Sequence, residues 1–363
     1  MGDRVIFNRG GVSPAHRNFA LDGLRTLAIL LMISSHTSRL IVWESRREWS
    51  RFVLLIEPLT ASLFLMLVGA SLVYSWHAAG IHARWSWYRK QLVRAGCLWI
   101  ISCLFYLAED GLRWPDAIFL SGILATIAYT SVLGMFVISS PYSIALLVFI
   151  STALISLNLF LDIHHLKWFM VNAGNSPFLP LLIFACLGAL GVLALESRKR
   201  WVQPLVLIVA LALLGAIRYR YSFTEIFSNP LGRFETARTF VTGPNEARTV
   251  KSIPYYNLRP ILIPVIASII VVIYGGLANL NSAGERFSKY FFPMGRFSLD
   301  IYILHLSLLA SLVVVSGGLR PLQKTWQGDA VILGLFLICQ GWAMGRDYFK
   351  RRKKVGRIAN SFH

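Results

Sequence analysis

Ionisable side chains stand inside long apolar stretches of this sequence, and they are the residues best suited to chemistry. The first stretch holds Asp22, Arg25 and His36. Arg25 and His36 are 11 residues apart, so at about 100° per residue they share one helix face, about 16 Å apart along the axis. Asp22 can pair with Arg25 one turn away, and Arg25 could alternatively snorkel to an interface. His36 could be a general base, or could make only a structural hydrogen bond.

Two later stretches add further candidates. Glu57 lies shortly after the start of the second apolar stretch. Because this stretch runs back across the membrane from the side where the first one ends, Glu57 is expected at roughly the same membrane depth as His36. Its carboxylate could fix the tautomer of an imidazole, or could simply meet water at the interface. Ser298, Tyr302 and His305 are spaced i, i+4 and i+7, which predicts one polar helix face that either lines a cavity or meets structural partners. The candidate catalytic residues are Asp22, Arg25, His36, Glu57, Tyr302 and His305.

A basic cluster lies between the second and third apolar stretches. Arg89, Lys90 and Arg94 follow two tryptophans and a tyrosine, and Lys90 and Arg94 are i, i+4 neighbours. Such a cluster could bind the phosphates of a nucleotide-like cofactor, or could be the positive charge that ordinarily marks a cytoplasmic loop. We treat these three residues as the candidate cofactor-binding set.

The apolar stretches themselves predict an all-α, polytopic membrane protein. The chain has 363 residues, of which 56% are hydrophobic and 15% charged, and its mean hydropathy is +0.59. A helix needs about 20 apolar residues to cross the hydrocarbon, and about ten stretches meet this length in a single domain, 1–363. The predicted spans are 20–43, 52–76, 91–109, 116–138, 141–161, 177–196, 201–218, 258–279, 294–316 and 328–346.

Charge sets the expected orientation. The net charge is +19, but the basic residues gather at the ends of the spans without a nucleic-acid motif, which argues against nucleic acid as a partner. Lys and Arg are more frequent on one side, which predicts that both termini, 1–19 and the basic tail 347–363, are cytoplasmic. The long loop 219–257 is then external, where its aromatic residues could bind sugar or lie in the interface. We expect a multi-pass protein of the bacterial inner membrane.

Cysteine usage gives no sign of a metal or disulfide framework. The four cysteines fall inside apolar spans and form no CxxC pair, so we expect them to pack as small hydrophobic residues and expect no metal. They are Cys97, Cys103, Cys186 and Cys339.

Several motifs, taken in order, resemble the transmembrane acyltransferase superfamily, which includes the acyltransferase-three and heparan-α-glucosaminide N-acetyltransferase families. Residues 21–25 followed by His36 are similar to the opening of the first, and residues 58–72 to the second helix of both. Residues 121–124 and 177–180 ahead of Gly188 are closer to the N-acetyltransferases. Residues 295–305 match a late motif of both, so that the similarity spans roughly residues 17 to 310.

The resemblance implies an acyl-CoA donor, most simply acetyl-CoA, on the cytoplasmic side. It implies a glycan or glycolipid acceptor reached from the outer side, with His36 as general base or transient acyl carrier. Arg89, Lys90 and Arg94 would hold the donor headgroup, and Arg25 would contact the donor or complete its channel. The competing class is a proton-coupled transporter or flippase for a lipid-linked or small glycan, since intramembrane His and Glu also relay protons. The sequence leaves open which acceptor is used, whether transfer is to oxygen or nitrogen, and how long the acyl group is. It also leaves open whether an acyl-enzyme forms and whether the protein is a homo-oligomer.

Overall fold

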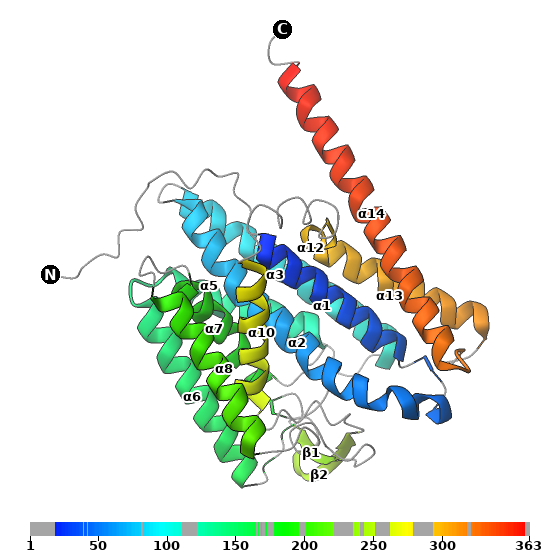
Figure 1. The fold of residues 1–363 in the computed structure, drawn as a ribbon, viewed down its shortest axis with the longest axis horizontal. Helices are drawn as coiled ribbons and strands as arrows, with labels where there is room; N and C mark the ends of the chain where they lie inside the picture. Colours follow the sequence, from blue (N-terminus) through cyan, green and yellow to red (C-terminus); the bar gives the residue numbers. More distant parts are fainter. Residues whose placement is uncertain are drawn as a thin grey trace, which may run out of the picture.

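The structure is a computed structural model. It describes residues 19–38, 40–41, 43–80, 83–110, 122–164, 166, 168, 171–172, 178–195, 201–220, 235–239, 243–250, 262–278, 293–317 and 321–359. These residues form a helical bundle with a small two-stranded hairpin at one end (Figure 1). The helices are α1 (Phe19–Ser38), α2 (Trp43–Ala79), α3 (Arg84–Asp110), α5 (Ile123–Ser139), α6 (Ser143–Ile163), α7 (Phe178–Leu195), α8 (Val202–Arg220), α10 (Leu262–Ala278), α12 (Pro293–Arg296), α13 (Ser298–Ser316) and α14 (Thr325–Ala359).

Every predicted span has a helix at its position, so the helical fold class is confirmed. Six helices are long and apolar enough to cross a membrane: part of α2 (Leu59–Ala79), most of α3, α6, α8, α13 and α14 up to Lys350. α5, α7 and α10 are shorter apolar helices. The number of crossings, about ten, stays a prediction because α1 and the three shorter helices fall outside that set.

Three details differ from the sequence-based expectation. The antiparallel strands β1 (Glu235–Thr239) and β2 (Gly243–Val250) lie in the expected external loop, so the described residues are not wholly α-helical. The predicted ninth helix is interrupted at Phe297, where α12 ends and α13 begins. The tail expected from residue 347 begins as a continuation of α14, which runs to Ala359.

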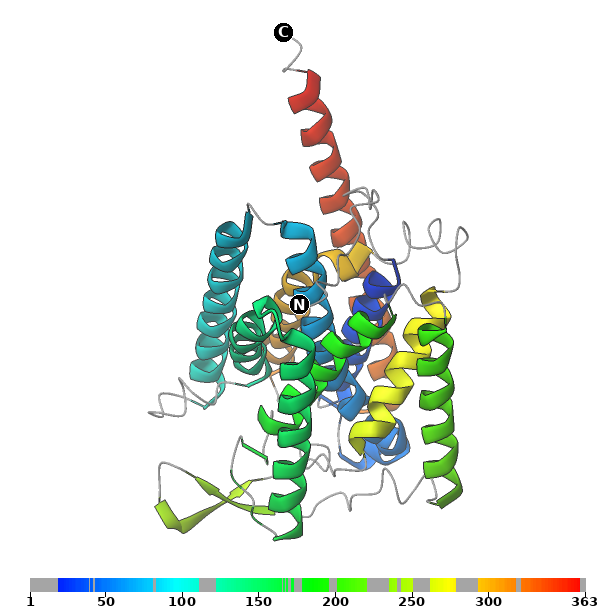
Figure 2. The ribbon, with the colours of Figure 1, turned by 90° about the vertical axis from the view of Figure 1, so that its left-hand side faces the viewer.

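Two sets of contacts define the ends of the bundle. At one end, Ile41 forms a parallel bridge with Leu322, which joins the α1–α2 connection to the α13–α14 connection. At the other end, the first turns of α1 lie against α12 and the second half of α14. The hairpin lies at the end away from the C-terminus of α14, which projects beyond the bundle (Figures 1 and 2). Which end is cytoplasmic remains a prediction from charge.

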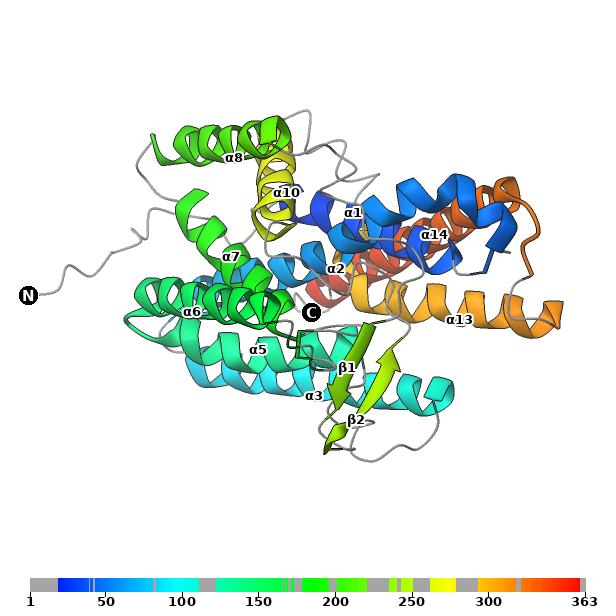
Figure 3. The same ribbon diagram turned by 90° about the horizontal axis from the view of Figure 1, so that it is seen from below.

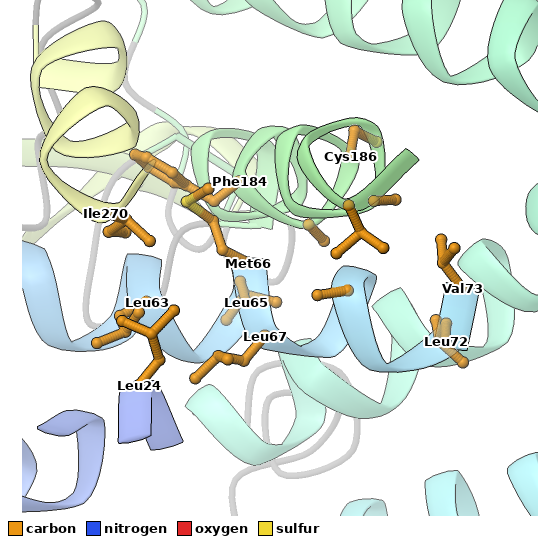
Figure 4. Packing of buried hydrophobic residues seen from close by; sticks show 14 of the residues in the cluster. Leu24, Leu63, Leu65, Met66, Leu67, Leu72, Val73, Phe184, Cys186 and Ile270 are labelled. Carbon is orange, nitrogen blue, oxygen red and sulfur yellow. The ribbon is translucent and has the colours of Figure 1, made fainter. Parts of the chain in front are cut away.

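α2 is the central helix of the main hydrophobic core. It packs against α1, α5, α7 and α10, and its apolar stretch is mostly buried, whereas most residues of the other five candidate spans are not buried. Figure 3 shows the bundle from below, where α3, α5 and α6 lie side by side. In Figure 4, apolar side chains of α2 meet those of α1, α7 and α10; the labelled residues include Leu24, Leu63, Met66, Phe184 and Ile270.

Two glycines let α2 and α7 approach closely. A Cβ on Gly188 would lie 2.1 Å from the backbone oxygen of Met66, and one on Gly69 would lie 1.9 Å from that of Ala185. The two backbones therefore touch at this crossing, as small residues permit between membrane helices. This contact fixes the position of α2, and with it the surface on which α1 rests.

A second, smaller core joins α1 to α12, α13 and α14. Ile29 and Ile33 of α1 belong to it together with Ile301 of α13. Their spacing of four residues, followed by His36 three residues later, is one stripe of a helix. Ile301 and His305 are likewise one turn apart on α13. The sequence pattern of both helices therefore brings an imidazole to the same apolar seam.

Candidate active site

The two histidines meet across the seam between α1 and α13. Nδ1 of His36 lies 2.9 Å from Nε2 of His305, a hydrogen-bonding distance. The ring planes differ by 5° and the ring centroids are 5.2 Å apart. His305 is fully buried and His36 partly buried. Each imidazole therefore supplies a polar partner for the other within an otherwise apolar layer.

Aromatic rings enclose this pair on one side. The ring of Tyr302 stands edge-on to His305, at 5.5 Å between centroids, and to His36, at 6.4 Å. Phe105 of α3 meets Tyr302 in turn, at 6.5 Å. Three sequence-predicted residues, His36, Tyr302 and His305, are thus brought together, and α3 contributes a ring that the sequence did not single out.

A second polar group lies at the other end of α1. Arg25 Nη1 donates to Asp22 Oδ1 at 2.9 Å, and Arg25 Nη2 donates to the hydroxyl of Ser71 on α2 at 2.6 Å. Asp22 is almost fully buried, and its other oxygen lies 3.8 Å from Nε of Arg296 on α12. Arg296 Nη1 donates to Asp347 of α14 at 3.0 Å. Two cations and two anions therefore connect α1, α12 and α14 while their charges cancel.

Close backbone packing supports this ionic network. A Cβ on Gly295 would lie 2.3 Å from the backbone oxygen of Asp22, so α12 can approach α1 only because residue 295 has no side chain. A second ion pair, Arg346 with Asp300, joins α14 to the start of α13 nearby and is more exposed. α12, the start of α13 and the second half of α14 are thereby fixed around the first turn of α1.

The histidine pair and the ionic network are two separate groups. Arg25 and His36 are separated by 11 residues of continuous helix, which corresponds to about 16 Å. Residues 295 and 305 are separated by a similar length on the neighbouring chain segment. α1 and the α12–α13 segment thus run side by side in the same direction, with charges at one level and histidines at the other.

The basic cluster lies on the outer surface of α3. Arg89, Lys90 and Arg94 are all exposed, whereas Trp87 and Gln91 turn inward and donate to the hydroxyl of Ser75 on α2. Ser75 is one turn from Ser71, the partner of Arg25. The cluster therefore lies at the same end of the bundle as the ionic network, but it does not converge with the histidines.

Several residues of these two groups carry no signal in the sequence. Ser71, Phe105 and Asp347 were not expected, although Arg296 lies inside the late motif. Asp347 was assigned to the tail, and Phe105 is one aromatic among many in an apolar span, so neither carried a signal. Glu57 belongs to α2, but its side chain lies outside the described residues.

The cysteines are free thiols in the structure. Cys186 and Cys339 are buried, as expected, whereas Cys97 is exposed on α3 and Cys103 is partly exposed, because α3 turns one face away from the bundle. In the part of the chain that the structure describes, no three His, Cys, Asp or Glu side chains are grouped as a metal site.

These features define a multi-pass helical membrane protein with a histidine pair inside the bundle and a compensated ionic network at one end. Residues 17–195, which include α1 to α7, match the family model described as heparan-alpha-glucosaminide N-acetyltransferase, catalytic. The chain is similar to this family over the matched region, which confirms the resemblance to the N-acetyltransferases. No curated protein matches the chain. His36 lies within the matched region, and its partner His305 lies beyond it.

Proposed function

We propose that this protein is a membrane-bound acetyltransferase that moves an acetyl group from cytoplasmic acetyl-CoA to a hydroxyl or amine of a glycan or glycolipid at the outer side. The observation that supports this most strongly is the histidine pair near the C-terminal end of α1, in a chain whose first half matches an acetyltransferase catalytic region. A base at that depth stands between a cytoplasmic donor and an external acceptor.

His36 performs the proton transfer in this proposal. Its imidazole takes the proton from the acceptor as the acceptor oxygen or nitrogen attacks the thioester carbonyl. The carbon–sulfur bond then breaks, and the thiolate of CoA takes the proton back from the imidazolium. In the two-step route, His36 attacks the thioester first and passes the acetyl group to the acceptor. Both routes consume one thioester and release one free thiol for each acetyl group transferred.

The donor is held at the charged end of the bundle. Arg89, Lys90 and Arg94 bind the phosphates of acetyl-CoA at the surface, since charge-assisted contacts to phosphate suit such a cluster. The pantetheine arm extends into the bundle past Arg25, whose guanidinium is fixed by Asp22 and Ser71. Tyr302 flanks the histidines and shapes the acceptor side of the site.

The test uses purified protein in bilayer nanodiscs, supplied with acetyl-CoA and a panel of amino sugars and glycans. We expect free CoA and acetylated product in equal amounts, with the product identified by a mass increase of one acetyl group. A proton-coupled transporter would release no CoA and would give no product. That result, with binding or movement of the glycan retained, would replace the acetyltransferase by the transporter.

A further inference from the structure

The hydrogen bonds around the two histidines determine where their protons lie. Nδ1 of His305 is 3.0 Å from the backbone oxygen of Ile301. A carbonyl oxygen can only accept, so Nδ1 of His305 carries the hydrogen. In neutral His305, Nε2 is then a lone-pair acceptor. Because that nitrogen faces Nδ1 of His36 at 2.9 Å, the hydrogen of neutral His36 lies on Nδ1.

The ring geometry agrees with this assignment. The two ring planes are nearly parallel, and the centroid separation of 5.2 Å is large relative to the 2.9 Å between the nitrogens. The rings are therefore joined edge to edge, with the N–H bond pointing along the lone pair of the acceptor. Tyr302 stands at 79° and 80° to the two rings and hinders their rotation.

This arrangement leaves the lone pair of His36 on Nε2. Free neutral histidine in water favours the opposite tautomer, with the hydrogen on Nε2. In that tautomer Nε2 has no lone pair with which to accept a proton or attack a carbonyl. A base is effective only in the tautomer that directs its lone pair at the substrate, and a neighbouring acceptor normally selects that tautomer. In this protein the selecting acceptor is a second histidine.

We propose that His305 is a positioning residue that holds His36 in its Nδ1–H tautomer and so presents the Nε2 lone pair to the substrates. The proposal rests on the proposed function for its catalytic meaning, since it concerns how the acetyl-transfer base is prepared. His305 is fully buried at the seam and acts through His36 rather than on the substrate. The backbone oxygen of Ile301 in turn fixes the tautomer of His305, and His305 fixes the tautomer of His36.

The tautomer can be measured directly, without donor or acceptor. The protein is labelled with ¹⁵N in its histidine rings and studied by NMR in nanodiscs at a pH where the rings are neutral. The signals of His36 among the eight histidines are identified by their loss in His36→Gln. We expect Nε2 of His36 in the wild type to give the signal of an unprotonated nitrogen. A protonated Nε2 in the wild type would overturn the proposal whatever the variants do.

Two substitutions separate positioning from packing. His305→Leu removes the acceptor, so we expect the hydrogen of His36 to move to Nε2 and kcat to fall at least about a hundredfold, with the KM for acetyl-CoA unchanged. His305→Gln keeps an oxygen at the position of Nε2, so we expect the Nδ1–H tautomer and most of the turnover to remain. An unchanged tautomer in folded His305→Leu would contradict the assignment, and His305→Met provides a second apolar replacement if the leucine variant does not fold.

The same experiments distinguish failure of this inference from failure of the proposed function. If the acetyltransferase assignment is wrong, no variant releases CoA, yet the tautomer of His36 still responds to His305. If only the positioning role is wrong, His36→Gln abolishes transfer while His305→Leu transfers normally with an unchanged tautomer.

Discussion

An imidazole between two apolar helices needs a polar partner, and His36 has one in His305. Burying an unpaired polar group costs roughly 1–3 kcal/mol, so the pair is more favourable than either ring alone. Structural pairing and catalysis are therefore both compatible with this contact. Substitutions that keep hydrogen bonding but remove proton transfer separate the two.

His36→Gln is such a substitution. An amide can still donate to His305 but cannot accept and return a proton at neutral pH. We expect a folded protein whose transfer rate falls at least about a hundredfold, the lower range for loss of a general base, and the same for His36→Ala. The measurement is CoA release alongside thermal unfolding in detergent. Near-normal turnover in His36→Gln would make His36 structural and pass the catalytic role to His305.

The proposed donor-binding cluster on α3 gives a second prediction about side chains. Replacing Arg89, Lys90 and Arg94 together by Ala should weaken acetyl-CoA binding by at least about tenfold, since one charge-assisted contact contributes about 1.5–3 kcal/mol. The rate at saturating donor should change less. Arg218 and Arg220, exposed cations of α8, give a matched control when both are changed to Ala. Unchanged donor affinity would direct attention to Arg198, Lys199 and Arg200.

Helix positions depend on a few close contacts, and among the described glycines those at the crossing of α2 with α7 make the closest approaches. A methyl group at residue 188 would overlap the backbone of Met66, whereas residue 191, one turn further on the same helix, has open space around its Cα. The sequence shows both positions as glycines in an apolar span. Only the packing distinguishes them.

We therefore expect opposite effects from two similar substitutions. Gly188→Ala should lower the unfolding temperature, since overpacking typically costs about 1–3 kcal/mol. Gly191→Ala should be neutral or slightly stabilising, because alanine favours helix by up to about 1 kcal/mol over glycine. Thermal unfolding of the purified variants measures both. Equal stability of the two variants would mean that α2 and α7 do not touch at residue 188.

The ionic network joins elements through a partly buried pair. Arg296 and Asp347 retain 16% and 20% of their side-chain exposure, against 47% and 36% for Arg346 and Asp300. Solvent screens the pair of Arg346 with Asp300 more strongly. The coupling free energy between these two residues should therefore be about 0–1 kcal/mol, as is typical of surface ion pairs.

A double-mutant comparison tests this difference. The double-mutant cycle of Asp347→Asn or Asp347→Ala with Arg296→Ala should give a clearly larger coupling free energy than the equivalent cycle on Asp300 and Arg346. Neighbouring charges in one network commonly couple by about 0.5–3 kcal/mol. The readout is unfolding temperature, repeated at high salt. A larger effect in the exposed pair would argue against the network as the attachment of α14.

At the scale of the whole molecule, the bundle has two distinct ends. The bridge between Ile41 and Leu322 is at one end, and the contacts of Asp22 with Arg296 and of Arg296 with Asp347 are at the other. α1 and α13 therefore run in the same direction. Parallel directions are expected for these two helices, because they correspond to the first and the ninth predicted spans, both odd-numbered. The orientation of the bundle in the membrane is a matter for experiment.

Site-specific labelling determines the orientation. In a cysteine-free background, we expect Ser228→Cys in the 219–257 loop to react with a membrane-impermeant maleimide on spheroplasts. Ser361→Cys in the tail should react only after permeabilisation, because basic segments remain cytoplasmic. Labelling in the reverse order would invert the donor and acceptor sides of the proposed reaction.

The amino-acid sequence sets the positions of the helices. Runs of about 20 apolar residues fold as helices in a bilayer because each backbone group must be satisfied within its own segment. It also determined local pairs such as Asp22 with Arg25, since residues three apart are neighbours on any helix. His36 and His305 stood out individually because imidazoles are costly in hydrocarbon.

Which of these residues meet depends on how the helices pack against one another. Periodicity assigns a side chain to a face of its own helix but does not identify the helix that packs against that face. The contact between His36 and His305 joins residues 269 positions apart, and only the packing of α1 on α13 produces it. The same holds for Arg296 and Asp347, and for the outward face of α3 that carries Arg89, Lys90 and Arg94. Helix–helix packing depends on close fits such as Gly188 against Met66, which no single segment encodes.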